Sequence, residues 1–292
     1  MSTSLRAGPE LIAILLNWGL FGVLSLQVYI YSQSFSTDKL ALKSLVGVLY
    51  ILEATQTFLM TQTVWSYFVS EEGKPEDIGV TWLSVWVVGG LVALLVQSFY
   101  AYRVSVFTRN KLIPGAIIMI SIASFGGALG AAVLSIQAKT IDKLLDTTSL
   151  IGFPIIAFWA VSCALCDGLI AGLMCYYLRR NNPVGEFSRT QAIVAKLIRM
   201  TIETGLLTAL TSTLILILYY PSSLKKFTYF LVPLAEHAKL YSTTMMAVLN
   251  NRTKFRDTAA ASTENRLVFA SSIREDSVKV TELKMKNQTI PV

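Results

Sequence analysis

Long apolar runs alternate with short polar gaps along most of the chain, from residue 11 to residue 249. A helix needs about 20 residues to cross a hydrocarbon core of about 30 Å. Seven runs are long enough: Leu11–Tyr31, Ala41–Phe68, Trp82–Val106, Leu112–Gln137, Leu150–Leu178, Ala192–Tyr220 and Phe227–Leu249. The pattern therefore predicts an all-α membrane protein, with a bundle of seven transmembrane helices over residues 1–250.

Helix-breaking residues stand near the ends of several runs and support these boundaries. Pro9 and Pro114 are expected in the first turns of their helices, where a missing N–H is harmless. Pro221 follows the sixth run, and the turn-forming residues 181–185 follow the fifth. Pro233 is expected to kink the seventh helix by freeing a backbone carbonyl in the preceding turn.

Composition agrees with the hydrophobic pattern. Of the 292 residues, 53% are hydrophobic and only 15% are charged, whereas about a quarter of a soluble domain is charged. We expect an integral protein of the plasma membrane or an endomembrane, with the lipid bilayer as its main partner. The net charge of +7 does not indicate nucleic-acid binding, because no basic stretch has interleaved aromatic residues or zinc-ligand spacing.

The distribution of basic residues predicts the orientation. With the N-terminus outside, eighteen of the 25 Lys and Arg residues fall in cytoplasmic segments and six fall outside. Arg103, Arg199 and Arg252 are cytoplasmic in this topology. Residues 251–292 are rich in Ser, Thr and charge, and are expected to form a disordered cytoplasmic tail.

Six ionisable residues stand out at bilayer depth within the predicted spans: Glu53, Asp167, Glu203, Glu236, His237 and Lys239. A charged side chain at this depth costs about 2.5–3.5 kcal/mol on insertion scales, so each needs a reason. Glu236 and Lys239 are three residues apart on one helical face, where they could pair. We predict one intramembrane polar cluster between the second, fifth, sixth and seventh helices. It either binds a ligand, relays protons or locks a conformation, or it only fixes helix register.

Small residues and cysteines inside the spans are interpreted as packing positions. Cys163, Cys166 and Cys175 share one apolar run, and no histidine cluster accompanies them, so neither a metal nor another cofactor is expected. Gly126-x-x-x-Gly130 and Gly168-x-x-x-Gly172 allow close approach of helices. This approach is expected mainly within the chain, with a homo-oligomer as the alternative.

Five local motifs stand out in the sequence: Asn17-Trp18-Gly19, Gln97-Ser98-Phe99-Tyr100-Ala101-Tyr102-Arg103, Cys166-Asp167, Ile198-Arg199-Met200-Thr201-Ile202-Glu203-Thr204-Gly205 and Lys239-Leu240-Tyr241-Ser242. They resemble a large family of fungal, mostly basidiomycete, seven-helix membrane proteins, and the resemblance spans roughly residues 8–252. This family is a domain of unknown function. The resemblance therefore implies the seven-helix topology and no reaction.

No soluble domain offers a nucleophile with its base or a phosphate-binding loop, and the chain has one histidine. We therefore expect no enzymatic activity. Three hypotheses remain. The protein could be a receptor-like sensor with a lipid-like ligand and a cytoplasmic signalling partner. It could be an ion- or proton-coupled transporter that uses the midplane carboxylates, or a structural membrane scaffold.

Overall fold

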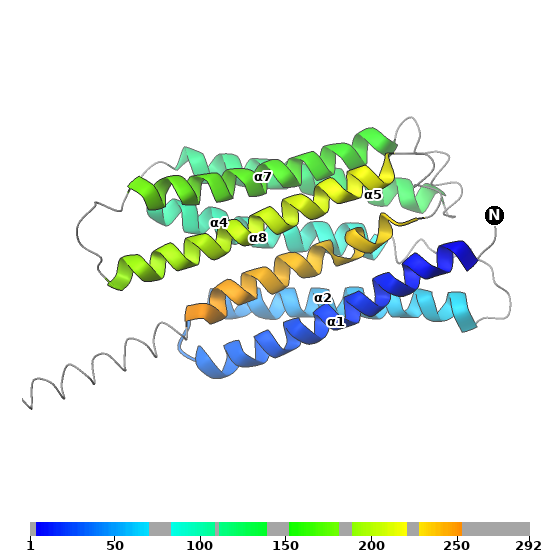
Figure 1. The fold of residues 1–292 in the computed structure, drawn as a ribbon, viewed down its shortest axis with the longest axis horizontal. Coiled ribbons are helices and arrows are strands. Elements are labelled where there is room, and N and C mark those ends of the chain that lie inside the picture. The colour runs from blue at the N-terminus through cyan, green and yellow to red at the C-terminus, as the bar shows by residue number, and fades with distance from the viewer. Residues whose placement is uncertain are drawn as a thin grey trace, which may run out of the picture. The chain divides into compact units, whose positions relative to one another are not determined.

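The computed structural model describes residues 4–69, 83–108, 111–138, 152–180, 189–220 and 228–252. Regular secondary structure in these ranges is helical throughout. The elements are α1 (Ser4–Ser34), α2 (Leu40–Val69), η1 (Ser84–Val88), α4 (Gly89–Phe107), α5 (Leu112–Ala138), α7 (Phe153–Arg180) and α8 (Arg189–Tyr219). A last helix at residues 231–252, orange in Figure 1, is named the C-terminal helix.

Because η1 and α4 are continuous, the described residues form seven helical segments, one for each predicted run. Five are long and apolar enough to cross a membrane: Gly8–Ser34, Leu40–Trp65, Ser84–Val106, Leu112–Ala138 and Phe153–Tyr177. In α8 only the shorter stretch Gly205–Tyr219 is comparably apolar. The chain is thus a multi-pass membrane protein.

Two proline predictions were wrong. Helix α1 already begins at Ser4, so Pro9 lies inside it and removes one helical hydrogen bond. The C-terminal helix begins at residue 231, not 227, so Pro233 stands in its first turn. There the missing N–H has no helical partner to lose, and Pro233 starts the helix instead of bending it. Pro114 occupies the first turn of α5, as predicted.

Several predictions concern residues outside the described ranges. They include the turn at residues 181–185, Pro221 and most of the predicted tail, from residue 253 onward; residues 251 and 252, also assigned to the tail, are instead the end of the C-terminal helix. The chain divides into two compact units, Met1–Leu249 and Asn250–Val292. The bundle of helices, with the C-terminal helix as far as Leu249, lies within the first unit.

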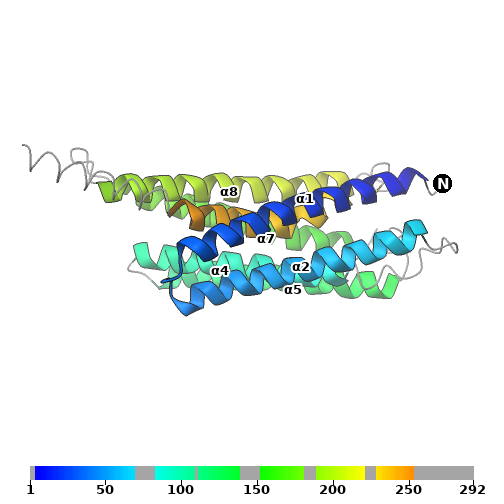
Figure 2. The ribbon, with the colours of Figure 1, turned by 90° about the horizontal axis from the view of Figure 1, so that it is seen from below.

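The helices of the first unit run side by side along a common direction in both views (Figures 1 and 2). Helix α7 packs against both α5 and α8, α5 packs against α4, and α1 packs against α2. Short connections between consecutive helices favour antiparallel neighbours of this kind. The C-terminal helix lies among them, between α8 and the α1–α2 pair in Figure 1.

Burial differs sharply between the outer helices and the C-terminal helix. No residue from 230 to 249 is exposed, so this helix is enclosed on all sides. In contrast, α1 exposes Leu15 and Leu26 by 63% and 60%, and α2 exposes Phe58 by 68%. Large apolar side chains on the outside are expected where lipid replaces water. A helix shielded from lipid can carry polar residues, which explains why residues 231–249 are less apolar than the other spans.

The first turns of the third helical segment form a π-helix, η1, which the hydrophobic pattern did not reveal. Trp86 lies in it with 3% exposure, and its ring meets that of Trp159 edge to face at 5.1 Å. A π-helical turn shifts the side chains that follow it relative to an ordinary α-helix. Beyond it, Gly89 approaches the C-terminal helix, where an added Cβ would lie 3.8 Å from Ala238.

Glycines bring α4, α5 and α7 into close contact. A Cβ at Gly127 would lie 3.1 Å from Trp159, and one at Gly130 would lie 3.2 Å from Ile155. The expectation that the α5 glycines pack within the chain is therefore confirmed for Gly130. An added Cβ at Gly168 or Gly172 would meet nothing within 4 Å.

We expect Gly90→Ala to destabilise the contact between α4 and α5. The new Cβ would lie 2.8 Å from the Cβ of Ala128 and 3.0 Å from the ring of Phe125, and overpacking of this kind costs about 1–3 kcal/mol. Thermal unfolding of the purified protein measures this effect. Gly126→Ala is the matched control, because its Cβ meets nothing within 4 Å and should raise stability slightly. Equal unfolding temperatures for the two variants would contradict the close approach of α4 and α5 at Gly90.

Candidate functional site

The C-terminal helix carries an ion pair to α2. Lys239 Nζ lies 3.0 Å from Glu53 Oε2, and both side chains are 0% exposed. The same ammonium donates to the backbone carbonyl of Glu53 at 3.3 Å. Ser242, one turn further on, donates to the other carboxylate oxygen of Glu53 at 2.6 Å. Both oxygens of this buried carboxylate are therefore bonded to the C-terminal helix.

Helix α1 completes this side of the network. Asn17 donates its amide N–H to the backbone carbonyl of Ala235 at 3.3 Å and accepts from the Thr57 hydroxyl at 3.0 Å. The Lys239 ammonium also lies 5.4 Å from the centre of the Phe21 ring, within the range of a cation–π contact. We call the group Asn17, Glu53, Lys239 and Ser242 the ionic cluster. It links α1, α2 and the C-terminal helix.

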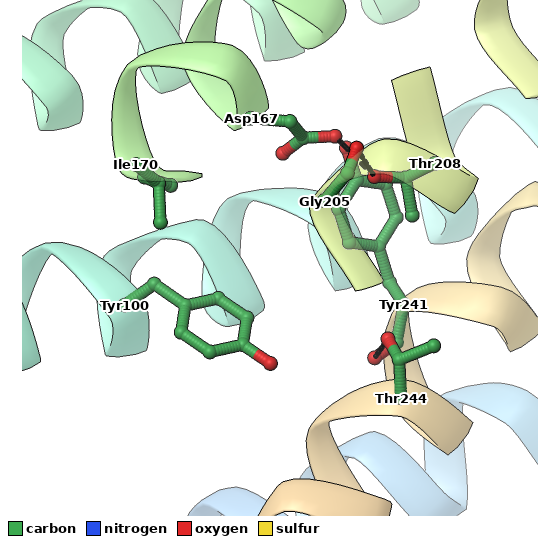
Figure 3. A pocket seen from close by; sticks show the side chains of 7 residues that line it. All are labelled: Tyr100, Asp167, Ile170, Gly205, Thr208, Tyr241 and Thr244. Carbon is green, nitrogen blue, oxygen red and sulfur yellow. Dashed lines mark hydrogen bonds between the residues drawn. The ribbon is translucent and has the colours of Figure 1, made fainter. Parts of the chain in front are cut away.

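A second cluster surrounds Asp167 on α7, and its contacts come from three other helices. Thr208 of α8 and Tyr241 of the C-terminal helix both donate to Oδ2 at 2.5 Å. Gln97 of α4 donates to Oδ1 at 3.1 Å and to the Tyr241 hydroxyl at 3.2 Å. Figure 3 shows the Asp167 carboxylate directed toward Thr208 and Tyr241. We call these four residues the Asp167 cluster.

A small cavity adjoins the Asp167 cluster (Figure 3). Its lining is formed by Tyr100, Asp167, Ile170, Gly205, Thr208, Tyr241 and Thr244. The volume is about 10 Å³, comparable to the space that one water molecule occupies. The cavity could therefore hydrate the carboxylate, but it is too small for an organic ligand.

The two clusters use different faces of the C-terminal helix. At 3.6 residues per turn, Lys239 and Ser242 share one face, while His237 and Tyr241 share a roughly opposite one. His237 is 3% exposed, and its ring meets Trp159 at 5.2 Å and Tyr241 at 5.1 Å, edge to face in both cases. One face of the C-terminal helix thus makes ionic contacts with α2 and a polar contact with α1. The other face makes aromatic and hydrogen-bonded contacts with α4 and α7.

Two neighbouring titratable side chains in this helix have no hydrogen bond within the described residues. Glu236 is 6% exposed and His237 is 3% exposed. Neither carboxylate oxygen of Glu236 and neither ring nitrogen of His237 has a hydrogen-bond partner in the part of the chain that the structure describes. Gln56, which is 0% exposed on α2, has the same property at both amide atoms. Buried polar atoms of this kind are uncommon and need an explanation.

The predicted polar residues are partly brought together. Lys239 pairs with Glu53 across two helices, because the Glu53 carboxylate faces it directly, although the spacing also allowed a pair with Glu236 on its own helix. Asp167 is bonded to other residues, so the described residues form two clusters where the sequence pattern predicted one. Glu203 is in α8, but its side chain lies outside the described part.

The three predicted cytoplasmic basic residues are not members of either cluster. The Arg103 guanidinium is half-buried over the Phe99 ring at 5.8 Å, and Arg199 is exposed on α8. Arg252 is the last residue that the structure describes.

Sequence reasoning missed the neutral members of the network. Asn17, Thr57, Gln97, Thr208, Tyr241 and Ser242 all lie in apolar runs and carry hydrogen bonds between helices. Amides inside apolar runs, Asn17 and Gln97, were the signal that could have revealed them. The hydroxyl residues give no such signal, because a Thr or Ser in a helix can bond its own backbone, as Thr213 does to Ala209.

The cysteines are not joined by disulfide bonds. Cys163 and Cys166 are buried, and Cys175 is partly buried. The Cys163 sulfur lies 3.0 Å from the Ser124 hydroxyl of α5. Within the described ranges no three His, Cys, Asp or Glu side chains are placed to hold a metal ion.

Comparison with known proteins relates part of this bundle to one family. Residues 163–254 match the model of DUF6534, a family of unknown function. The matched segment covers most of α7, all of α8 and the C-terminal helix, and therefore includes Asp167, Thr208, Lys239 and Tyr241. It excludes Glu53 on α2. No curated protein matches the chain, and no solved structure matches it.

Proposed function

We propose that the protein is a receptor-like sensor with seven membrane spans, whose C-terminal helix is held in one position by the ionic cluster. The observation that carries the proposal is the ion pair between Lys239 and Glu53, which is fully enclosed. A buried ion pair contributes little net stability compared with apolar packing of equal volume, but it strongly favours one alignment of its two helices. Such a contact suits a conformational lock.

The position of the C-terminal helix supports the same proposal. It contacts α1 and α2 through the ionic cluster and α4 and α7 through the Asp167 cluster, and Phe230 at its start packs on Tyr219 of α8 at 5.0 Å. A displacement of this one helix would change contacts with five neighbours at once. Switching proteins need such an element with two discrete arrangements, biased by a ligand that binds them unequally.

Two further features belong to the proposal. The first is the seven-span topology, with the N-terminus outside and the tail in the cytoplasm, which the distribution of Lys and Arg supports. Thiol labelling at both chain ends tests it, and labels on the same side of the membrane would contradict it. The second is membership of the fungal family of seven-helix proteins, which the sequence motifs between residues 17 and 242 support. The match over residues 163–254 relates the last three helices to a family of unknown function.

The ligand that we propose is small and lipid-like, reaching the bundle from the bilayer, and a cytoplasmic partner would respond through the tail. The cavity beside Asp167 holds about one water, which disfavours an enclosed organic ligand at that point. We propose ligand binding and helix movement without catalysis, because Asp167 and Glu53 are engaged by hydroxyl, amide and ammonium donors.

Ligand-dependent thermal stabilisation tests the sensor proposal. The purified full-length protein in lipid nanodiscs would be heated with a panel of sterols, free fatty acids and anionic phospholipids. A sensor is expected to show a rise in unfolding temperature with at least one class, reduced in Lys239→Met. The matched control is Lys39→Met, since Lys39 is exposed and outside both clusters. No stabilisation by any class would count against sensing and leave the scaffold hypothesis ahead.

An ion- or proton-coupled transporter is the second candidate. It is favoured by the adjacent buried side chains Glu236 and His237, which have no hydrogen-bond partner among the described residues. Intramembrane titratable residues are common in proton pathways. Proteoliposomes with an imposed pH gradient distinguish the two candidates. A transporter predicts proton or ion flux that is lost in Glu53→Gln, and flux at the level of empty liposomes would rule it out.

A further inference from the structure

Glu236 differs from the other buried acids of the bundle in its hydrogen bonding. Glu53 and Asp167 each accept hydrogen bonds at both carboxylate oxygens. Glu236 is 6% exposed, and within the described ranges neither of its oxygens accepts one. Taking a charged carboxylate away from water without such partners is costly. Its surroundings must therefore supply compensation of another kind.

The charges around Glu236 do not balance. Lys239 on its own helix and Glu53 from α2 are the ionisable groups that act on it most closely, and the Asn17 amide of α1 adds the weakest of these polar influences, without the geometry of a hydrogen bond. From α7, the neutral ring of Trp159 packs on the neighbouring His237. Two carboxylates thus share one ammonium, which Glu53 holds at 3.0 Å. One bound proton would remove the excess negative charge, and a proton needs no cavity.

Lys239 can reach either carboxylate. Glu236 and Lys239 are three residues apart in the same helix, a spacing at which side chains are neighbours. Glu53 occupies the other side of the ammonium, on α2. The Lys239–Glu53 pair joins two helices, whereas a Lys239–Glu236 pair would lie within one helix and join none. The choice of partner therefore decides whether the C-terminal helix is bound to α2.

We propose that Glu236 is a proton-binding site that controls which carboxylate holds Lys239. With the proton bound, Glu236 is neutral and Lys239 stays with Glu53. When the proton leaves for the solvent, the Glu236 carboxylate competes for the ammonium, and the link from the C-terminal helix to α2 weakens. This inference rests on the proposed function, in which the ionic cluster is the lock, and it identifies a proton as a ligand that operates it.

The other buried titratable groups are less suited to this exchange. Asp167 accepts from three neutral donors and lies on the opposite face of the C-terminal helix. His237 is on that face too, between the rings of Trp159 and Tyr241. Neither has a position from which to compete for Lys239.

The distance between α2 and the start of the C-terminal helix tests the inference. Spin labels would be attached at Trp65→Cys on α2 and Tyr229→Cys, because these residues are 67% and 45% exposed. Cys175→Ser removes the partly buried native thiol, and Cys163 and Cys166 are both 0% exposed. Distance distributions of the full-length protein in nanodiscs would be recorded between pH 5 and pH 9. Thermal unfolding at the same pH values gives a second measurement.

The expected result is a distance distribution that changes with pH, together with an unfolding temperature that falls as the pH rises. The distance response should be lost in Glu236→Gln, which imitates the protonated side chain and should keep the low-pH distance at every pH, and the fall in unfolding temperature should become smaller. Asp167→Asn removes the buried carboxylate on the opposite face of the helix and should retain the pH dependence of the distance. A pH response that persists unchanged in Glu236→Gln would overturn the inference.

Lys239→Met separates failure of this inference from failure of the proposed lock. If this variant changes the distance at pH 5 while the unsubstituted protein shows no pH response, the lock stands and the proton site is wrong. If Lys239→Met leaves the distance unchanged at pH 5 and at pH 9, the lock itself is wrong, and the proton site falls with it.

Discussion

Lys239→Met is expected to lower the free energy of unfolding by about 3–5 kcal/mol, which is the usual effect of removing one partner from a buried ion pair. The loss comes mainly from Glu53, whose carboxylate would remain 0% exposed without its ammonium partner. Methionine has nearly the length and volume of lysine, so little of the effect should come from packing. Thermal or denaturant unfolding in a single detergent measures it.

The double variant Glu53→Gln/Lys239→Met separates the pair from the single charges. A glutamine at position 53 can still accept the hydroxyl hydrogen bond of Ser242, and no charge is left without a partner. We expect this variant to be much more stable than Lys239→Met, because neutral replacements of a buried pair are often tolerated. Lys39→Met, at an exposed position, serves as the control and should change stability by less than about 0.5 kcal/mol. Additive effects of the two substitutions would show that the ion pair does not couple α2 to the C-terminal helix.

The second large effect is expected at Asp167. Asp167→Ala removes the acceptor for Gln97, Thr208 and Tyr241 together. Hydrogen bonds between membrane helices average about 0.6 kcal/mol and reach about 1.7 kcal/mol, so three of them and the space left by the side chain amount to about 2–4 kcal/mol. Asp167→Asn keeps an acceptor and the shape of the side chain, and it should lose less than half as much.

Two threonines of α8 provide an internal control for this cluster. Thr208 bonds Asp167 at 2.5 Å, whereas Thr213 is exposed and bonds the backbone carbonyl of Ala209. Thr208→Val should therefore destabilise the bundle, and Thr213→Val should not. If Asp167→Ala and Thr208→Val both unfold at the temperature of the unsubstituted protein, the Asp167 cluster does not hold α4, α7, α8 and the C-terminal helix together.

Both predictions concern contacts of the C-terminal helix, which is unusual among the helices of this chain. Helices that face lipid need apolar side chains on that side, and Leu15 of α1 and Phe58 of α2 are examples. The C-terminal helix has no exposed residue between positions 230 and 249. It can therefore carry Glu236, His237 and Lys239. Each of these buried polar side chains then needs a hydrogen-bonding or charged partner within the protein. Glu236 and His237 lack hydrogen bonds within the described residues, and of these two Glu236 is the proposed proton-binding site.

The alternatives to sensing make different predictions for the same variants. A scaffold would lose stability in Lys239→Met and Asp167→Ala, but it would show neither ligand-dependent stabilisation nor a pH-dependent distance. A transporter would show flux that depends on Glu53. Measurements of stability, distance and flux on one set of variants therefore separate the three hypotheses.

The sequence alone determined that this chain is helical and belongs in a membrane. Runs of more than 20 apolar residues cannot be hidden in a small soluble core, and each run needs its backbone hydrogen bonds satisfied within itself. All seven predicted runs overlap helical segments, and five meet the length and hydropathy of a membrane span. Residues that are costly in lipid, such as Glu53 and Lys239, could also be identified from the sequence, because each is a charged residue inside an apolar run.

Only the tertiary structure decided how those residues are paired. Spacing within one helix showed only that Lys239 could pair with Glu236. The carboxylate that lies 3.0 Å from the ammonium belongs to Glu53, 186 positions away in sequence. Spacing could not separate Asp167 into its own cluster either, because its partners come from three other helices. Local sequence fixes which face of a helix a side chain occupies, whereas its partner depends on which other helices pack against that face.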